Sequence, residues 1–231
     1  MALWVKICGV TRVQDAQAAF EAGADAVGIN LWPGSKRYCE PSRARDLVAA
    51  LGPGRLVFGV FVRESRRRIE ELVREVGLAG VQLHGGEPVD EARGWSLPVI
   101  RAVQATSRDA VAQALAGVEQ AEPMEQAASP ARHAPSDRAA RDFSGSAAWR
   151  LLVDHASGGG TGKAVEASLL EGLDLSQAIL AGGLTPSNVA ATVRRSRPFG
   201  VDTAGGVESA PGIKDPVAIK AFVQAAREAA S

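Results

Sequence analysis

The feature that most constrains the fold is an alternation of short apolar runs with segments of helical periodicity, repeated about eight times. We predict that the apolar runs are β-strands at 3–8, 26–32, 56–62, 81–85, 99–103, 150–154, 178–184 and 200–202. Such alternation favours parallel strands joined by helical crossovers. Eight units in 231 residues predict one α/β domain folded as a closed (β/α)8 TIM barrel over residues 1–231. A doubly wound open sheet is the alternative, but the first strand-to-helix turn lacks the dinucleotide-binding glycine pattern.

Several polar residues predict where helices begin. Thr11, with Gln14 three residues later, matches a capping box at the start of the first helix. Thr185 followed by Pro186 predicts a second helix start, and Asp215 followed by Pro216 a third. Helices are also expected at 41–51, 88–93, 107–116 and 164–170.

One segment breaks the alternation. Residues 118–147 are rich in Glu, Gln, Ala, Pro, Ser and Arg and have no clear period. We interpret this segment as a solvated, flexible insertion before the sixth strand. Deleting much of it is therefore expected to leave the fold intact.

The composition argues against several classes of protein. Lys and Arg together number 26, as do Asp and Glu, so no basic excess points to nucleic acid. No apolar run approaches the roughly 18 residues of a membrane span, and no signal peptide is recognisable at the N-terminus. Two cysteines do not make a disulfide framework, and three histidines without close pairing argue against a metal site. A reduced, cytoplasmic enzyme is the simplest expectation.

Two residues at predicted strand ends are candidates for acid–base chemistry. Cys8 ends the first strand beside Lys6 and before Gly9, so it is either a buried small apolar residue or a reactive thiolate acting as base or nucleophile. Asp154 ends the sixth strand, where it either makes a loop hydrogen bond or acts as a general acid. In a barrel, both side chains would face one pocket at the carboxyl ends of the strands.

Other residues near the strand ends are candidates for substrate binding. Arg37 is either a surface charge or a bidentate partner for a carboxylate, which Lys36 could bind only as a point charge. His84 and Asp202 either brace loops or contact the substrate. Glycine loops that could be simple turns or could bind phosphate through backbone N–H groups occur at 158–162, at Gly182 and Gly183, and at Gly205 and Gly206.

A set of motifs, taken in order, resembles the phosphoribosylanthranilate isomerase family across nearly the whole chain except the insertion. The motifs are the runs at 6–9, 23–28, 35–38, 58–62 and 81–85, Asp154 with 159–163, 182–184 with Pro186, Asn188 and Val189, and 201–202 with 206–208. The chain departs from the family pattern at Ala204 and Gly205, where hydroxyl residues are usual. It also departs after Lys163, where the family usually has an aromatic residue, an acidic residue and a tryptophan in succession.

The resemblance implies a (β/α)8 barrel that catalyses the Amadori rearrangement of N-(5-phosphoribosyl)anthranilate in tryptophan biosynthesis, without cofactor or metal. It implies Asp154 as general acid, Cys8 as general base and Arg37 as the ligand of the anthranilate carboxylate, with phosphate held around Gly183, Gly205 and Gly206. The only expected partner is this phosphorylated small molecule, with no nucleic acid or membrane, and the chain would be a monomer or homodimer.

Two other functions stay open at this point. A sugar-phosphate isomerase of histidine synthesis would need paired catalytic aspartates at strands one and five, whereas strand one here ends in Cys8. A barrel that binds phosphate without catalysis is supported only by the altered loop at Ala204 and Gly205.

Overall fold

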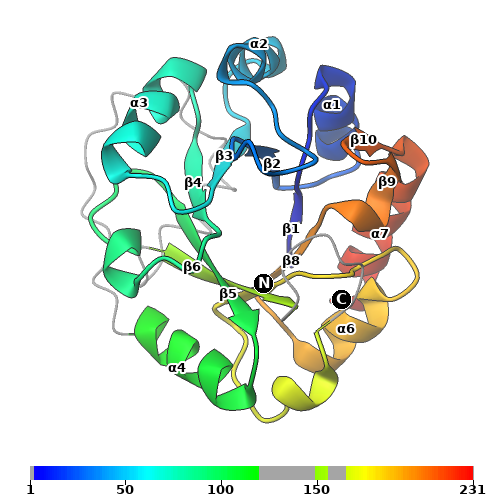
Figure 1. Ribbon diagram of the computed structural model, residues 1–231. Helices are drawn as coiled ribbons and strands as arrows, with labels where there is room; N and C mark the ends of the chain where they lie inside the picture. The colour runs from blue at the N-terminus through cyan, green and yellow to red at the C-terminus, as the bar shows by residue number, and fades with distance from the viewer. Residues whose placement is uncertain (1–2, 120–148, 156–164, 231) are drawn as a thin grey trace.

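The chain forms a closed barrel of eight parallel strands surrounded by helices, as the alternation predicted (Figure 1). The computed structural model describes residues 3–119, 149–155 and 165–230. The barrel strands, in spatial and sequence order, are β1 (Trp4–Ile7), β2 (Ala26–Asn30), β3 (Leu56–Phe61), β4 (Gly80–Leu83), β5 (Val99–Ala105), β6 (Trp149–His155), β7 (Ala178–Leu180) and β8 (Gly200–Thr203). β1 pairs with β8 and closes the barrel, which excludes the open sheet.

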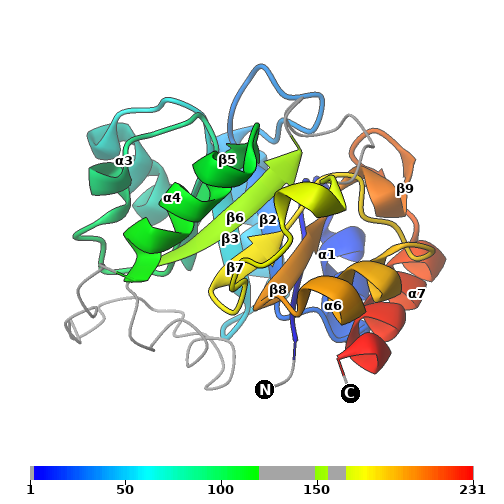
Figure 2. The ribbon, with the colours of Figure 1, turned by 90° about the horizontal axis from the view of Figure 1, so that it is seen from below.

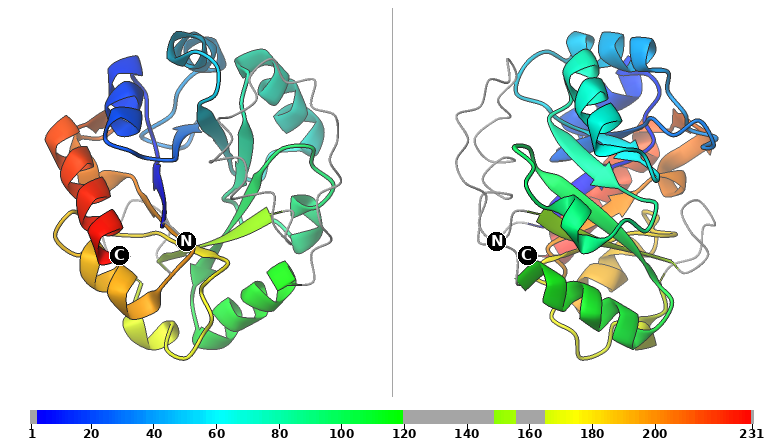
Figure 3. Two further views of the ribbon diagram at one scale, coloured as in Figure 1. Left: turned by 180° about the vertical axis from the view of Figure 1, so that it is seen from behind. Right: turned by 60° about the vertical axis from the view of Figure 1, so that its left-hand side comes forward.

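The helices lie outside the barrel (Figures 1 and 3). They are α1 (Val13–Glu21), α2 (Pro41–Leu51), α3 (Arg66–Val76), α4 (Arg108–Glu119), α6 (Val189–Ser196) and α7 (Pro216–Ala229), with short 3-10 turns η1 (Val89–Ala92), η2 (Ala167–Leu169) and η3 (Gly205–Val207). A small antiparallel pair, β9 (Glu208–Ala210) and β10 (Ile213–Lys214), precedes α7. Both ends of the described chain emerge at the amino-terminal end of the barrel, opposite the carboxyl ends of the strands (Figure 2). No helix among the described residues is long and apolar enough to cross a membrane.

The strand alternation sorts side chains between two cores. Trp4 packs inside the barrel against Phe58, with the rings edge to face at 6.2 Å, whereas Val5 and Ile7 are buried in the layer beneath the helices. Because side chains alternate along a strand, Lys6 and Cys8 share the inner face with Trp4. The barrel interior is thus aromatic and aliphatic near the start of β1 and polar near its end.

The predicted helix starts have mixed outcomes. Asp215 caps α7 as predicted, since its side chain accepts hydrogen bonds from the backbone N–H groups of Val217 and Ala218. The capping box at Thr11 was wrong: α1 has no side-chain cap, and the Thr11 hydroxyl instead donates to the Gly212 carbonyl at 2.6 Å. The start at Thr185 was also wrong.

The reason is local to the loop after β7. Residues 186–188 form a turn that α6 follows, and the Asn188 side chain braces this turn by accepting from Thr185 N–H and donating to the Gly183 carbonyl. β7 ends at Leu180, earlier than predicted, because Gly182 and Gly183 take positive φ angles of 78° and 60°.

Helix α4 is longer than predicted and includes the first two residues of the predicted insertion. Val118 is buried within this helix. The remainder of the predicted insertion, 120–147, lies outside the described residues, as do the glycine loop at 158–162 and the start of the helix expected at 164–170. In the described part of that last segment only the 3-10 turn η2 forms.

Candidate active site

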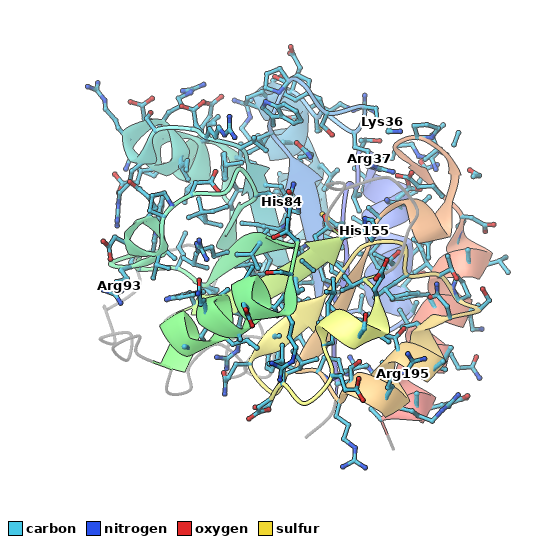
Figure 4. The ribbon with its side chains drawn as sticks, turned by 60° about the horizontal axis from the view of Figure 1, so that its bottom comes forward. Lys36, Arg37, His84, Arg93, His155 and Arg195 are labelled. Atoms are coloured by element: carbon cyan, nitrogen blue, oxygen red, sulfur yellow. The ribbon has the colours of Figure 1, made fainter. Side chains whose placement is uncertain are left out.

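A cavity of about 1270 Å³ opens at the carboxyl ends of the barrel strands. Nine of the residues proposed for the site from the sequence line it, namely Cys8, Arg37, His84, Asp154, Gly182, Gly183, Asp202, Gly205 and Gly206. The glycine loop at 158–162, also proposed for phosphate, lies outside the described residues. The parallel barrel explains the convergence, because each of these cavity-lining residues ends a strand or follows one. Figure 4 shows Arg37 and His84 on this face, whereas Arg93 and Arg195 lie at the periphery.

Cys8 follows β1 and is held by a backbone hydrogen bond from its N–H to the Thr203 carbonyl at 2.8 Å. The residue is 9% exposed. Burial raises the pKa of the Cys8 thiol above its ordinary value, and the nearby Lys6 ammonium opposes this effect. The buried thiol therefore loses its proton less readily than an exposed one, and the Lys6 charge offsets part of this cost.

Asp154 lies near the end of β6 and is 3% exposed. One carboxylate oxygen, Oδ1, accepts from the backbone N–H of His155 at 2.8 Å, while Oδ2 lies 3.3 Å from His84 Nε2. Two hydrogen bonds thus fix the carboxyl group at the cavity wall. β6 is separated from β1 by only β7 and β8 on one side and by four strands on the other, so Asp154 and Cys8 face the cavity from different sides.

His84 links Asp154 to a buried glutamine that the sequence did not single out. Gln82 Nε2 lies 2.8 Å from His84 Nδ1. With the amide nitrogen as donor, Nδ1 accepts and Nε2 carries the proton that points to Asp154. Gln82 and His84 are two residues apart, so the strand alternation that places one inward also places the other.

Asp202 is paired with Lys6. The two residues lie opposite each other in the register of β1 and β8, and Lys6 Nζ is 2.9 Å from Asp202 Oδ1. The Lys6 side chain is completely buried. Burial works against its ammonium, but Asp202 and then Cys8 outweigh it, so the pKa of Lys6 is raised. Asp202 also lines the cavity, as expected from the sequence. Its carboxylate therefore borders the cavity while it pairs with the Lys6 ammonium.

Arg37 is clamped by a glutamate. Arg37 Nε and Nη2 donate to the two carboxylate oxygens of Glu208 at 2.7 and 2.8 Å. The fully buried Lys214 also donates to Glu208, at 2.9 Å. Burial acts against the Glu208 charge, yet hydrogen bonds from Arg37 and Lys214 outweigh it and lower the pKa of Glu208. Sequence reasoning missed Glu208 and Lys214 as site residues, because only the β9–β10 hairpin brings them over the barrel.

Gly205 and Gly206, in the loop after β8, let the backbone of this loop pack closely against neighbouring groups. A Cβ on Gly206 would lie 1.8 Å from the Leu184 carbonyl oxygen, so only glycine lets this loop contact the β7 loop. A Cβ on Gly205 would lie 3.1 Å from Arg37 Nη2. The loops after β7 and β8 thus lie side by side at one edge of the cavity. Among the residues that the structure describes, no group of three or more His, Cys, Asp or Glu side chains could hold a metal ion.

The family model for N-(5'-phosphoribosyl)anthranilate (PRA) isomerase matches residues 5–125 and 117–225 of this chain. The chain belongs to the PRA isomerase family. A PRA isomerase of Myxococcus xanthus is 43% identical over 231 residues, covering 98% of this chain and 97% of the relative.

Solved structures of PRA isomerases share the fold at full length. The Thermotoga maritima enzyme is 32% identical with a TM-score of 0.74, covering 98% of this chain and 99% of that one. A PRA isomerase in complex with reduced 1-(o-carboxyphenylamino)-1-deoxyribulose 5-phosphate is 32% identical with a TM-score of 0.72 and the same coverage. These matches favour a PRA isomerase site over the two alternatives that the sequence left open.

Proposed function

We propose that this chain catalyses the Amadori rearrangement of N-(5'-phosphoribosyl)anthranilate to 1-(2-carboxyphenylamino)-1-deoxyribulose 5-phosphate in tryptophan biosynthesis. The observation that carries the proposal is that a buried thiol, Cys8, and a buried carboxyl group, Asp154, face one cavity from different strands, with Arg37 at its edge. Membership of the PRA isomerase family supports the same reaction.

Asp154 is proposed as the general acid. In its protonated form it gives a proton to the ribose ring oxygen, and the C1′–O bond breaks to leave a protonated Schiff base between C1′ and the anthranilate nitrogen. His84 contacts the same carboxyl group, so we propose that His84 holds Asp154 in place and borders the bound sugar. The charge on the Schiff base nitrogen then makes the C2′ proton acidic.

Cys8 is proposed as the general base. Its thiolate takes the C2′ proton, and the electron pair forms the C1′–C2′ double bond of an enolamine as the iminium nitrogen becomes neutral. Tautomerisation moves a proton to C1′ and gives the C2′ ketone. The steps need one acid and one base and no redox partner. A base thiol must stay reduced, which is consistent with a cytoplasmic location for the chain.

The remaining cavity residues are proposed to bind the substrate. Arg37 binds the anthranilate carboxylate through the N–H groups that Glu208 leaves available. Asp202 binds a sugar hydroxyl, and backbone groups at Gly182, Gly183, Gly205 and Gly206 bind the phosphate. No cofactor or metal takes part in the proposed reaction.

The test compares the two cysteines. Loss of phosphoribosylanthranilate fluorescence, with the substrate generated in situ, is followed for the unaltered chain, for Cys8→Ser and for Cys39→Ser. Cys39 is also buried, but it packs in the outer core and does not line the cavity. We expect fast decay for the unaltered chain and for Cys39→Ser, and severe loss for Cys8→Ser, because a hydroxyl is a much weaker base than a thiolate. Equal activity of the folded Cys8→Ser variant would remove Cys8 from the mechanism, and no activity in the unaltered chain would favour a non-catalytic barrel.

A further inference from the structure

The fully buried Lys6 lies beside Cys8 on the inner face of β1. Both side chains fill the space above Gly28 of the neighbouring strand β2. A Cβ at Gly28 would lie 2.8 Å from Cys8 Sγ and 3.2 Å from Lys6 Nζ. The absence of a side chain at Gly28 thus lets an ammonium and a thiol share one enclosed space. Lys6 is 0% exposed, so its charge acts on these buried neighbours and not on solvent.

Charged groups face Cys8 from several elements. They are Lys6 of β1, Asp202 of β8, Lys214 of β10 and Arg37 from the loop after β2. Glu208 of β9 is bound by both Lys214 and Arg37. These groups comprise three cations and two carboxylates. One positive charge is therefore in excess while Cys8 is a thiol, and the cluster is neutral when Cys8 is a thiolate.

We propose that Lys6 is the positioning residue that makes Cys8 usable as a base: its ammonium, oriented by Asp202, supplies the positive charge beside which the buried thiol ionises. A thiolate in an enclosed site is costly unless a cation lies next to it. Lys6 is fixed in that place by the register of β1 and β8 and by its 2.9 Å contact with Asp202. The catalytic meaning of this inference rests on the proposed role of Cys8, but the ionisation of the thiol can be measured without substrate.

The two neighbours act on the thiol in opposite directions. After burial, which raises the pKa of Cys8, the Lys6 ammonium is the strongest influence and lowers it, whereas the Asp202 carboxylate raises it. Removing one charge or the other should therefore move the titration of Cys8 in opposite directions. A purely structural role for the Lys6–Asp202 pair would not produce this pattern.

The experiment titrates Cys8 in the substrate-free protein. The background is Cys39→Ala, so that Cys8 is the single thiol, and thiolate absorbance near 240 nm is followed against pH with Cys8→Ser as the blank. We expect Lys6→Met to raise the midpoint by about one pH unit or more, and Asp202→Asn to lower it. Lys220→Met, at an exposed position of α7, should leave it unchanged. Folded Lys6→Met protein with an unshifted midpoint, or a shift in the same direction for Lys6→Met and Asp202→Asn, would overturn the proposal.

Lys6→Met leaves the Asp202 carboxylate without its cation, which could prevent folding. A double variant provides the test in that case. Lys6→Met combined with Asp202→Asn removes both charges, and its midpoint is compared with that of Asp202→Asn alone. We expect the double variant to titrate at higher pH, because only the Lys6 charge differs between the two proteins. Equal midpoints would refute the inference.

The pH dependence of kcat/KM separates this inference from the proposed function. If Cys8 is the base and Lys6 assists it, the limb of the profile that reports thiolate formation moves with the thiol midpoint in each variant. If the titration midpoint of the thiol shifts but the pH profile of kcat/KM does not, the effect of Lys6 is confirmed and Cys8 is rejected as the base. An unchanged titration midpoint of Cys8 in the Lys6 variants would reject the role of Lys6, whatever their activity.

Discussion

Glu208 joins the cavity edge to the buried interior, and replacing it with glutamine should have a large effect on stability. Its carboxylate accepts hydrogen bonds from Arg37 at 2.7 and 2.8 Å, from Lys214 at 2.9 Å and from the Gly212 N–H at 3.1 Å. In the Glu208→Gln variant, the fully buried Lys214 ammonium keeps the Ala204 carbonyl at 2.9 Å but loses its negative partner. An unpaired buried charge is the origin of the expected loss.

The magnitude follows from the burial of the two partners. Removing one member of a buried ion pair costs about 3–5 kcal/mol. Glu208 borders the open cavity and glutamine keeps one oxygen acceptor, so we expect about 3 kcal/mol, near the lower end of that range. For a domain of this size, that loss corresponds to a decrease in Tm of about 6–12 °C.

The assay is urea unfolding of the unaltered chain and of Glu208→Gln, with Glu71→Gln as the control. Glu71 lies on α3 and pairs with Arg67 and Arg68 at the surface, so its replacement should give no measurable change. A loss below about 1 kcal/mol in Glu208→Gln would refute the view that this cluster is a buried, coupled unit.

The pH dependence gives a second check on the same variant. The pKa of Glu208 is lowered in the folded chain, so its carboxylate stabilises the fold above its ordinary pKa of 4.5, and this contribution is lost as the pH falls toward the folded value. The free energies of unfolding of the unaltered chain and of Glu208→Gln should therefore differ fully at neutral pH and converge below about pH 4.5. A difference in the free energy of unfolding that stays constant as the pH falls well below 4.5 would contradict the view that the ionised Glu208 carboxylate stabilises the fold.

Three further variants test other parts of the account. Arg37→Ala should mainly raise KM in the isomerase assay, because it removes the carboxylate anchor; a loss confined to kcat would contradict that role. Asp215→Ala removes the cap of α7 and should lower the free energy of unfolding by about 1 kcal/mol without changing kcat. Gly28→Ala places a methyl group 2.8 Å from Cys8 Sγ and should reduce kcat about tenfold or more, because it displaces the base; unchanged kcat in this variant would show that the thiol has room to move.

The barrel could be predicted from the sequence because its determinants are local. Each strand is a short apolar run and each helix has a periodic stripe, so alternation alone gave eight parallel strands and the face on which the site lies. The same reasoning placed Cys8, Asp154 and Arg37 together, since residues at the carboxyl ends of the strands converge in any such barrel.

The partners of these residues could not be predicted, because they depend on long-range contacts. Lys214 and Glu208 reach Arg37 only through the β9–β10 hairpin. Glu208 lies in the 206–208 motif of the family resemblance, but nothing in its spacing shows that it pairs with Arg37 or Lys214. The helix starts predicted at Thr11 and Thr185 were wrong because both hydroxyls have other partners: that of Thr11 donates to the Gly212 carbonyl in a distant loop, and that of Thr185 pairs with Ser187 in its own loop. Gln82 could have been found, since it precedes His84 by two residues on the same strand face.

The most direct test of the central claim is the rate of phosphoribosylanthranilate fluorescence loss for the unaltered chain and for Asp154→Asn, measured in parallel. Asparagine keeps the shape and the contact with His155 but cannot deliver a proton to the ring oxygen. We expect rapid decay for the unaltered chain and a turnover lower by several orders of magnitude for the folded variant. Turnover close to normal in Asp154→Asn would contradict the proposed acid and the mechanism built on it.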